Sequence, residues 1–112
     1  MLNFVVAAIY IYLLVQVREN ISRALANALA QPVTLNDNQY AALVSWTCNI
    51  GIGNMESSDL VRCMNAGEHV SLVAHDELPQ WNKANGQVVD GLTRCRAAEL
   101  KLFDAPATLP AL

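Results

Sequence analysis

Signals that start and stop helices alternate along residues 36–104, and this alternation constrains the fold more than any other feature. Asn36 can cap a helix whose third residue, Gln39, can reach back to the cap, while Leu35 and Tyr40 can pack around it. The later signals are Gly51, Ser57 or Ser58, Gly67, Pro79 and Asp90. They predict helices over 36–51, 57–67, 68–78 and 90–103.

An amphipathic segment precedes these helices and ends at Pro32. Its apolar residues recur at helical spacing, and polar residues fill the opposite face. The apolar set is Ile21, Ala24, Leu25, Ala28 and Leu29, and the polar set is Arg18, Glu19, Asn20, Arg23 and Asn27. We therefore predict an all-α domain of about five helices over residues 18–104, followed by a flexible tail over 105–112 that contains two prolines.

Residues 1–17 form a separate apolar N-terminal segment in this prediction. The unbroken run from Phe4 to Val15 has twelve apolar residues, whereas a spanning helix needs about 20. Three interpretations stay open: a buried helix that continues into the amphipathic segment, a membrane or signal-anchor segment, and a cleaved signal. Arg18 and Arg23 would hold the following chain on the cytoplasmic side of a membrane.

Charge and cysteine content bear on which partners and covalent links the protein can have. The 112 residues carry a net charge of −3, and the seven basic residues are scattered, which argues against a nucleic-acid partner. Cys48, Cys63 and Cys95 are odd in number and widely spaced, and they lie at apolar positions of predicted helices. We expect them to be buried, although a disulfide between two of them stays open.

Two stretches outside the helices could carry a site. Residues 49–54, NIGIGN, place two glycines two apart, which is typical of a helix end and turn and falls short of a nucleotide-binding fingerprint. Trp81 opens an irregular stretch in which Asn85 and Gly86 favour a tight turn.

The acidic and nucleophilic residues suggest no chemistry by their spacing. Glycoside hydrolysis needs two carboxyl groups facing each other across a cleft, and neighbours such as Asp76 and Glu77 point in different directions on a helix. His69 and His75 are six apart, which does not suit shared zinc binding on a helix. We predict no metal, no cofactor and no recognisable catalytic residue.

Several uncommon strings in one order resemble the C-terminal helical lobe of the phage-type lysozyme family. They are LVSW followed by NIGIGN, then NAGE, WNK and GLTRCR, and the closest segment is WNKANGQVVDGLTRCRAAELKLF. The likeness runs from about Arg18 to Phe103. It implies a peptidoglycan N-acetylmuramidase ancestry, with the peptidoglycan glycan strand as ligand.

The chain departs from the family pattern where catalysis would reside. The family carries a catalytic glutamate and a glycine-rich hairpin before its long linking helix, whereas the first glycine here is Gly51. Glu19 lies within the helix that resembles the linking helix, so it does not match the catalytic glutamate. Cys48 stands where the family has an aromatic residue beside the cleft.

The resemblance places five residues at the sugar cleft: Asn49, Gly51, Ser58, His75 and Trp81. The amide of Asn49 could bond an acetamido or hydroxyl group, and Trp81 could stack on a sugar ring. Structural roles compete for three of them, namely a turn for Gly51, a cap for Ser58 and core packing for Trp81.

The sequence therefore predicts a truncated, inactive lysozyme-family protein that lacks its catalytic lobe. The alternatives are a non-catalytic peptidoglycan-binding or membrane-tethered module, and an enzyme whose acid comes from an unexpected place. Its location would be the bacterial cytoplasm or inner membrane, with the cell wall as the family target. The missing lobe should leave apolar surface that residues 4–15 cover or that drives self-association. Membrane contact through residues 4–15 is the further possibility that their apolar character leaves open.

Overall fold

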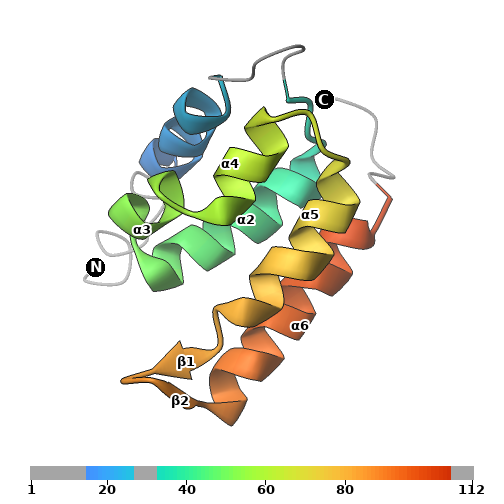
Figure 1. Ribbon diagram of the computed structural model, residues 1–112. Coiled ribbons are helices and arrows are strands. Elements are labelled where there is room, and N and C mark those ends of the chain that lie inside the picture. Colours follow the sequence, from blue (N-terminus) through green and yellow to red (C-terminus); the bar gives the residue numbers. More distant parts are fainter. Residues whose placement is uncertain (1–14, 27–32, 107–112) are drawn as a thin grey trace, which may run out of the picture.

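The computed structural model describes residues 15–26 and 33–106, and these form a mostly helical bundle (Figure 1). The all-α prediction is confirmed, with one minute β-hairpin added. Residues 1–14, 27–32 and 107–112 lie outside the described residues, so the structure does not test whether the apolar run continues into one long N-terminal helix. No helix in the described part of the chain combines the length and apolar character that crossing a membrane requires.

Residues 15–25 are helical, and one face of this helix enters the core. Val17, Ile21 and Leu25, each four residues from the next, are buried, as the amphipathic spacing requires. On the exposed side, Arg18 pairs with Asp37 at 3.2 Å and its guanidinium lies 4.7 Å from the Tyr40 ring centre. The helix is thereby fastened to the start of the next one.

Helix α2 spans Asp37–Ile50 and begins with the predicted capping box. The Asn36 side chain accepts a hydrogen bond from the Gln39 amide at 2.8 Å, and the Gln39 side chain accepts one from the Asn36 amide at 2.9 Å. Helix α2 ends at Gly51, as predicted. Gly53 instead lies within a short helix that was not predicted, α3 (Ile52–Glu56), because the tight reversal is complete at Gly51.

Helix α4 spans Asp59–Asn65, with Ser58 as its cap. It ends in a Schellman motif: the Gly67 amide donates to Met64 and the Glu68 amide donates to Cys63. Helix α5 (Val70–Glu77) passes into a 3-10 turn, η1 (Leu78–Gln80), where Pro79 occupies an early position that needs no amide hydrogen.

Strands β1 (Lys83–Ala84) and β2 (Gln87–Val88) pair antiparallel around the predicted tight turn. Both turn residues, Asn85 and Gly86, have positive φ, as this hairpin class requires. Helix α6 spans Asp90–Asp104. The prediction that Asp90 caps α6 is wrong, because Val89 occupies the cap position directly after the hairpin and Asp90 is the first helical residue.

The buried face of α6 contains charged as well as apolar side chains. Its buried members are Arg96, Glu99 and Phe103, whereas Cys95 and Leu102 are exposed. The expectation of buried cysteines is therefore wrong for Cys95 and also for Cys48, which is exposed, and Cys63 is half-buried; all three cysteines are free.

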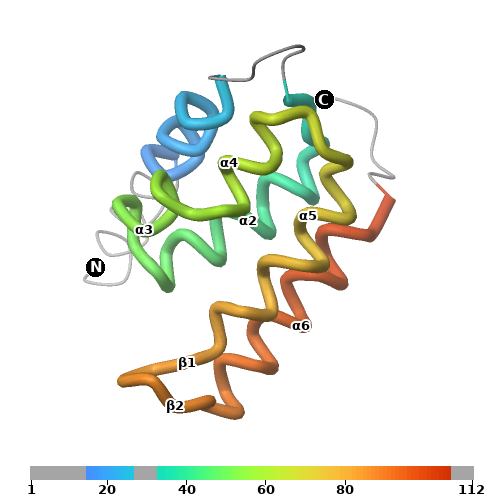
Figure 2. Tube along the Cα trace, in the orientation of Figure 1, coloured from blue at the N-terminus to red at the C-terminus, as the bar shows by residue number. Residues whose placement is uncertain are grey.

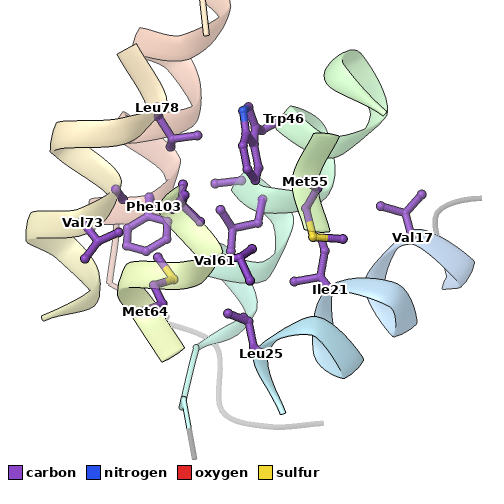
Figure 3. Close-up of a cluster of buried hydrophobic side chains, with 14 residues drawn as sticks. Val17, Ile21, Leu25, Trp46, Met55, Val61, Met64, Val73, Leu78 and Phe103 are labelled. Carbon is purple, nitrogen blue, oxygen red and sulfur yellow. The ribbon is translucent and has the colours of Figure 1, made fainter. Parts of the chain in front are cut away.

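One hydrophobic core joins the helices (Figure 3). Phe103, Val73, Met64 and Leu78 lie toward α5 and α6, and Met55 lies with the N-terminal helix on the other side. The tube in Figure 2 shows α5 running alongside α6, joined through η1 and the hairpin. Among the elements from α2 to α6, helices α2 and α6 pack together most extensively, and the polar residues between them carry the candidate site.

Candidate functional site

Asn49 is the second-to-last residue of α2 and is exposed. Its side-chain oxygen, Oδ1, accepts a hydrogen bond from Nη1 of Arg96 on α6 at 3.0 Å. The same Nη1 donates to the backbone carbonyl of Trp81 at 3.2 Å. Arg96 therefore ties the end of α2 to the segment that leaves η1.

Arg96 is itself held by Glu99. The Nε and Nη2 atoms of Arg96 face the two carboxylate oxygens of Glu99, at 2.6 Å and 3.0 Å respectively. Ser45, on α2, donates its hydroxyl to the same carboxylate at 2.5 Å. Both charged side chains are buried, with 2% and 5% of their surfaces exposed. We call Ser45, Asn49, Trp81, Arg96 and Glu99 the Arg96 network.

Trp81 is half-buried and packs edge-on against the fully buried Trp46, with ring centres 5.9 Å apart and an interplanar angle of 70°. Aromatic pairs favour this edge-to-face geometry, because the positive ring edge meets the negative ring face. The side chain of Trp81 thus contributes to the core, while its carbonyl belongs to the Arg96 network. Trp81 as a whole is partly exposed.

Gly51 sets the path of the chain beyond Asn49. Its φ of 95° and ψ of 152° lie in a region that only glycine adopts readily. Its amide donates to the Thr47 carbonyl at 2.8 Å, which closes α2. No atom lies within 4 Å of where a Cβ would stand, so the backbone conformation and not crowding explains the glycine.

Ser58 is buried and serves as the predicted cap. Its hydroxyl donates to the Met55 carbonyl at 2.7 Å and accepts from the Val61 amide at 3.3 Å. Ser58 also lines a groove of about 630 Å³ between the N-terminal helix and the α3–α4 turn, a volume in the range of ligand sites. The groove is lined by Asn20, Arg23, Ala24, Glu56, Ser57, Ser58, Val61, Arg62 and Asn65.

The groove has polar and apolar lining and carries charges of both signs. Arg62 pairs with Asp59 at 3.1 Å, and this contact raises the pKa of the guanidinium. Asn65 donates from Nδ2 to the Ala24 carbonyl at 2.9 Å. Its buried Oδ1 has no hydrogen-bond partner in the described chain. The lining offers hydrogen bonds in both directions and no single preferred charge.

His75 is exposed on α5 and pairs with Asp104, at the end of α6, with 2.6 Å between Nε2 and Oδ2. The structure therefore joins Asn49 and Trp81 through Arg96, with Gly51 two residues further on. Ser58 belongs to the groove, and the polar contact of His75 is with the end of α6. None of the five is tested as a ligand contact, so their binding role stays a prediction.

Sequence reasoning missed Arg96, Glu99 and Ser45. The available signal was an arginine three residues before a glutamate on a helix whose flanking positions are apolar, a spacing that allows side-chain pairing. Nothing in the spacing shows that this pair is turned inward. Its partners on α2 lie 47 and 54 residues away in the sequence.

The described carboxylates give little sign of a catalytic acid or a metal site. Among the residues described, Glu99 is the buried acid. Its carboxylate pairs with Arg96 and accepts a hydrogen bond from Ser45. The pKa of Glu77 is raised by partial burial and by the nearby charges of Asp59 and Asp76. Residues 15–26 and 33–106 contain no group of three metal-ligating side chains that could hold an ion.

The fold and the site together define a lysozyme-like helical domain. The solved muramidase domain of SpmX from Asticaccaulis excentricus is 37% identical, with a TM-score of 0.61 over 85% of this chain and 65% of that structure. More particularly, the Phage lysozyme family model matches residues 10–99. The chain belongs to this family, which confirms the resemblance noted in the sequence.

Curated relatives show how much of a family member the chain spans. The endolysin of Bacillus phage PZA is 41% identical over 76 residues, which are 68% of this chain and 29% of that protein. The endolysin of Acyrthosiphon pisum secondary endosymbiont phage 1 is 36% identical, over 79% of this chain and 62% of that protein. The chain thus spans less than two thirds of either relative.

Proposed function

We propose that this chain is a peptidoglycan-binding member of the phage lysozyme family that does not cleave the glycan strand by itself. The observation that carries the proposal is the environment of Glu99, which is the buried carboxylate among the described residues. A glycosidase needs one carboxyl group that delivers a proton and a second that faces it across the substrate. Glu99 instead faces Arg96 and Ser45 inside the protein.

The other described acids support the same conclusion. Glu77 has a raised pKa, which suits an acid, but it belongs neither to the Arg96 network nor to the groove lining. Glu56 is exposed and lines the same groove as Arg23 and Arg62, which differs from the apolar pocket that tunes a catalytic acid. Glu19 is exposed on the N-terminal helix. An inactive form without the family glutamate fits these positions.

Binding is supported by the exposed residue Asn49 and by the partly exposed Trp81, which Arg96 links. Carbohydrate sites combine a few oriented polar groups with aromatic faces. Similarity to relatives named endolysin and to a muramidase domain supports the peptidoglycan glycan strand as the ligand. Membrane contact through residues 4–15 and self-association stay predictions, since residues 4–14 lie outside the described part.

The test is sedimentation of the full chain with purified peptidoglycan, run beside an assay for release of reducing sugar ends. We expect co-sedimentation without release, and weaker co-sedimentation for Asn49→Ala. Gln39→Ala, at the other end of α2, is the matched control and should bind like the wild type. Release of reducing ends would refute the inactive assignment, and failure to co-sediment would refute binding.

A further inference from the structure

The side-chain amide of Asn49 has a fixed polarity. A guanidinium has five N–H donors and no acceptor, so the atom that meets Arg96 Nη1 at 3.0 Å must be the Asn49 oxygen. The amide nitrogen, Nδ2, then points away from Arg96. In the described part of the chain it has no hydrogen-bond acceptor, and Asn49 is exposed. The protein therefore presents an N–H₂ donor to solvent at this position.

Arg96 cannot easily release that orientation. It is buried, its Nη2 donates to Glu99, its Nε lies 2.6 Å from the same carboxylate, and its Nη1 is shared between Asn49 and the Trp81 carbonyl. Glu99 is fixed in turn by Ser45. A flip of the Asn49 amide would set donor against donor and remove one buried hydrogen bond from the guanidinium.

We propose that Arg96 is a positioning residue that holds Asn49 as an outward hydrogen-bond donor, so that the site selects ligands through an acceptor oxygen. The acetamido carbonyl of an N-acetylated sugar is such an acceptor, whereas the ammonium of a deacetylated sugar offers only donors. This inference rests on the proposed binding function. It adds which chemical group of the glycan the site requires.

The donor role is tested by titrating the full chain with tri-N-acetylchitotriose and with the fully deacetylated trimer. The wild type should bind the acetylated trimer at least about tenfold more tightly. Asn49→Asp keeps the size of the side chain and its contact with Arg96 but removes the donor, and should abolish the preference. Gln39→Glu adds the same charge at the other end of α2 within an intact capping box, and should leave the preference unchanged.

The positioning role is tested without ligand, by the ¹⁵N heteronuclear NOE of the Asn49 side-chain amide. The wild type should give an ordered amide, and Arg96→Lys a mobile one, because an ammonium cannot hold Glu99, Asn49 and Trp81 in the planar geometry of a guanidinium. If Arg96→Lys does not fold, Glu99→Gln loosens the same guanidinium while retaining it. An amide that stays ordered in the folded variant overturns the positioning role.

The outcomes separate this inference from the proposed function. If the wild type binds both trimers equally, or if Asn49→Asp retains the preference, the donor role is wrong while peptidoglycan binding stands. If the wild type binds neither trimer nor peptidoglycan, the proposed function and the donor role both fail. The NOE measurement then still decides whether Arg96 positions Asn49.

Discussion

Ser45 on α2 donates a hydrogen bond of 2.5 Å to the carboxylate of Glu99 on α6, and so links two helices whose facing residues are 54 positions apart. We expect Ser45→Ala to lower the free energy of unfolding by about 1.5–3 kcal/mol, the usual range for a hydrogen bond to a charged group. Chemical denaturation measures this change. A loss below a few tenths of a kcal/mol would show that the link contributes little.

Removal of one member of the Arg96–Glu99 pair should be more damaging than removal of both. Arg96→Met or Glu99→Leu leaves a buried charge without its partner, which costs about 3–5 kcal/mol. The double variant Arg96→Met/Glu99→Leu replaces the pair by apolar side chains of similar length and should recover much of that loss. A double-mutant cycle in urea measures the coupling, and strictly additive losses would contradict the prediction.

Gly51 and Gly53 form a matched pair. Both have open space where a Cβ would stand, but only Gly51 has a positive φ. Gly51→Ala should therefore destabilise the fold by about 1–3 kcal/mol through backbone strain. Gly53→Ala, within α3, should be neutral or stabilising by up to about 1 kcal/mol. Thermal unfolding of both variants checks this, and equal effects would show that φ is not the cause.

The N-terminal helix should be part of the cooperative unit. Ile21 is 1% exposed, so Ile21→Ala should cost about 2–5 kcal/mol through lost burial and a residual cavity. Glu19→Ala, on the exposed face of the same helix, should change stability by less than about 0.5 kcal/mol. If Ile21→Ala leaves the unfolding midpoint unchanged, the helix does not belong to the folded core.

The raised pKa of Glu77 predicts that the stability of the fold depends on pH. Its pKa is raised by partial burial and by Asp59 and Asp76, so the folded state binds its proton more tightly than the unfolded state does. The contribution of Glu77 to stability is therefore largest below its unfolded pKa of about 4.3 and is lost as the pH rises through the folded pKa. Glu77→Gln should raise stability at pH 7 by some tenths of a kcal/mol, typical of relieved like-charge contacts.

The comparison for Glu77 is the same variant at pH 3, where the wild-type carboxyl is protonated in both states. The stability difference between variant and wild type should shrink toward zero there. A gain of equal size at both pH values would point to packing and not to charge as its origin.

Local signals in the sequence predicted much of this fold. The capping box at Asn36, the glycine at the end of α4 and the Asn85–Gly86 turn each involve residues within a few positions, and the structure confirms all three. The same local reasoning failed for Gly53, because a second glycine after a helix end predicts a longer turn. The chain instead starts α3 at once.

The site was less predictable, because its contacts join distant segments. Asn49 and Trp81 were proposed from the family resemblance, but the arginine that connects them looked like one more charged residue on a helix. Whether Arg96 faces solvent or the interior depends on Glu99 beside it and on Ser45 across the interface. Helical periodicity records neither the depth of a polar side chain nor its partner on another helix.

The edge-on pairing of Trp46 and Trp81 gives the chain a built-in optical reporter. They are its only two tryptophans and their ring centres are 5.9 Å apart, so almost all intrinsic emission excited at the red edge arises from this one spot. Trp46 lies on α2, and the backbone carbonyl of Trp81 accepts a hydrogen bond from Arg96. Any event that shifts α2 against the segment after η1 should therefore change the fluorescence spectrum without an added label.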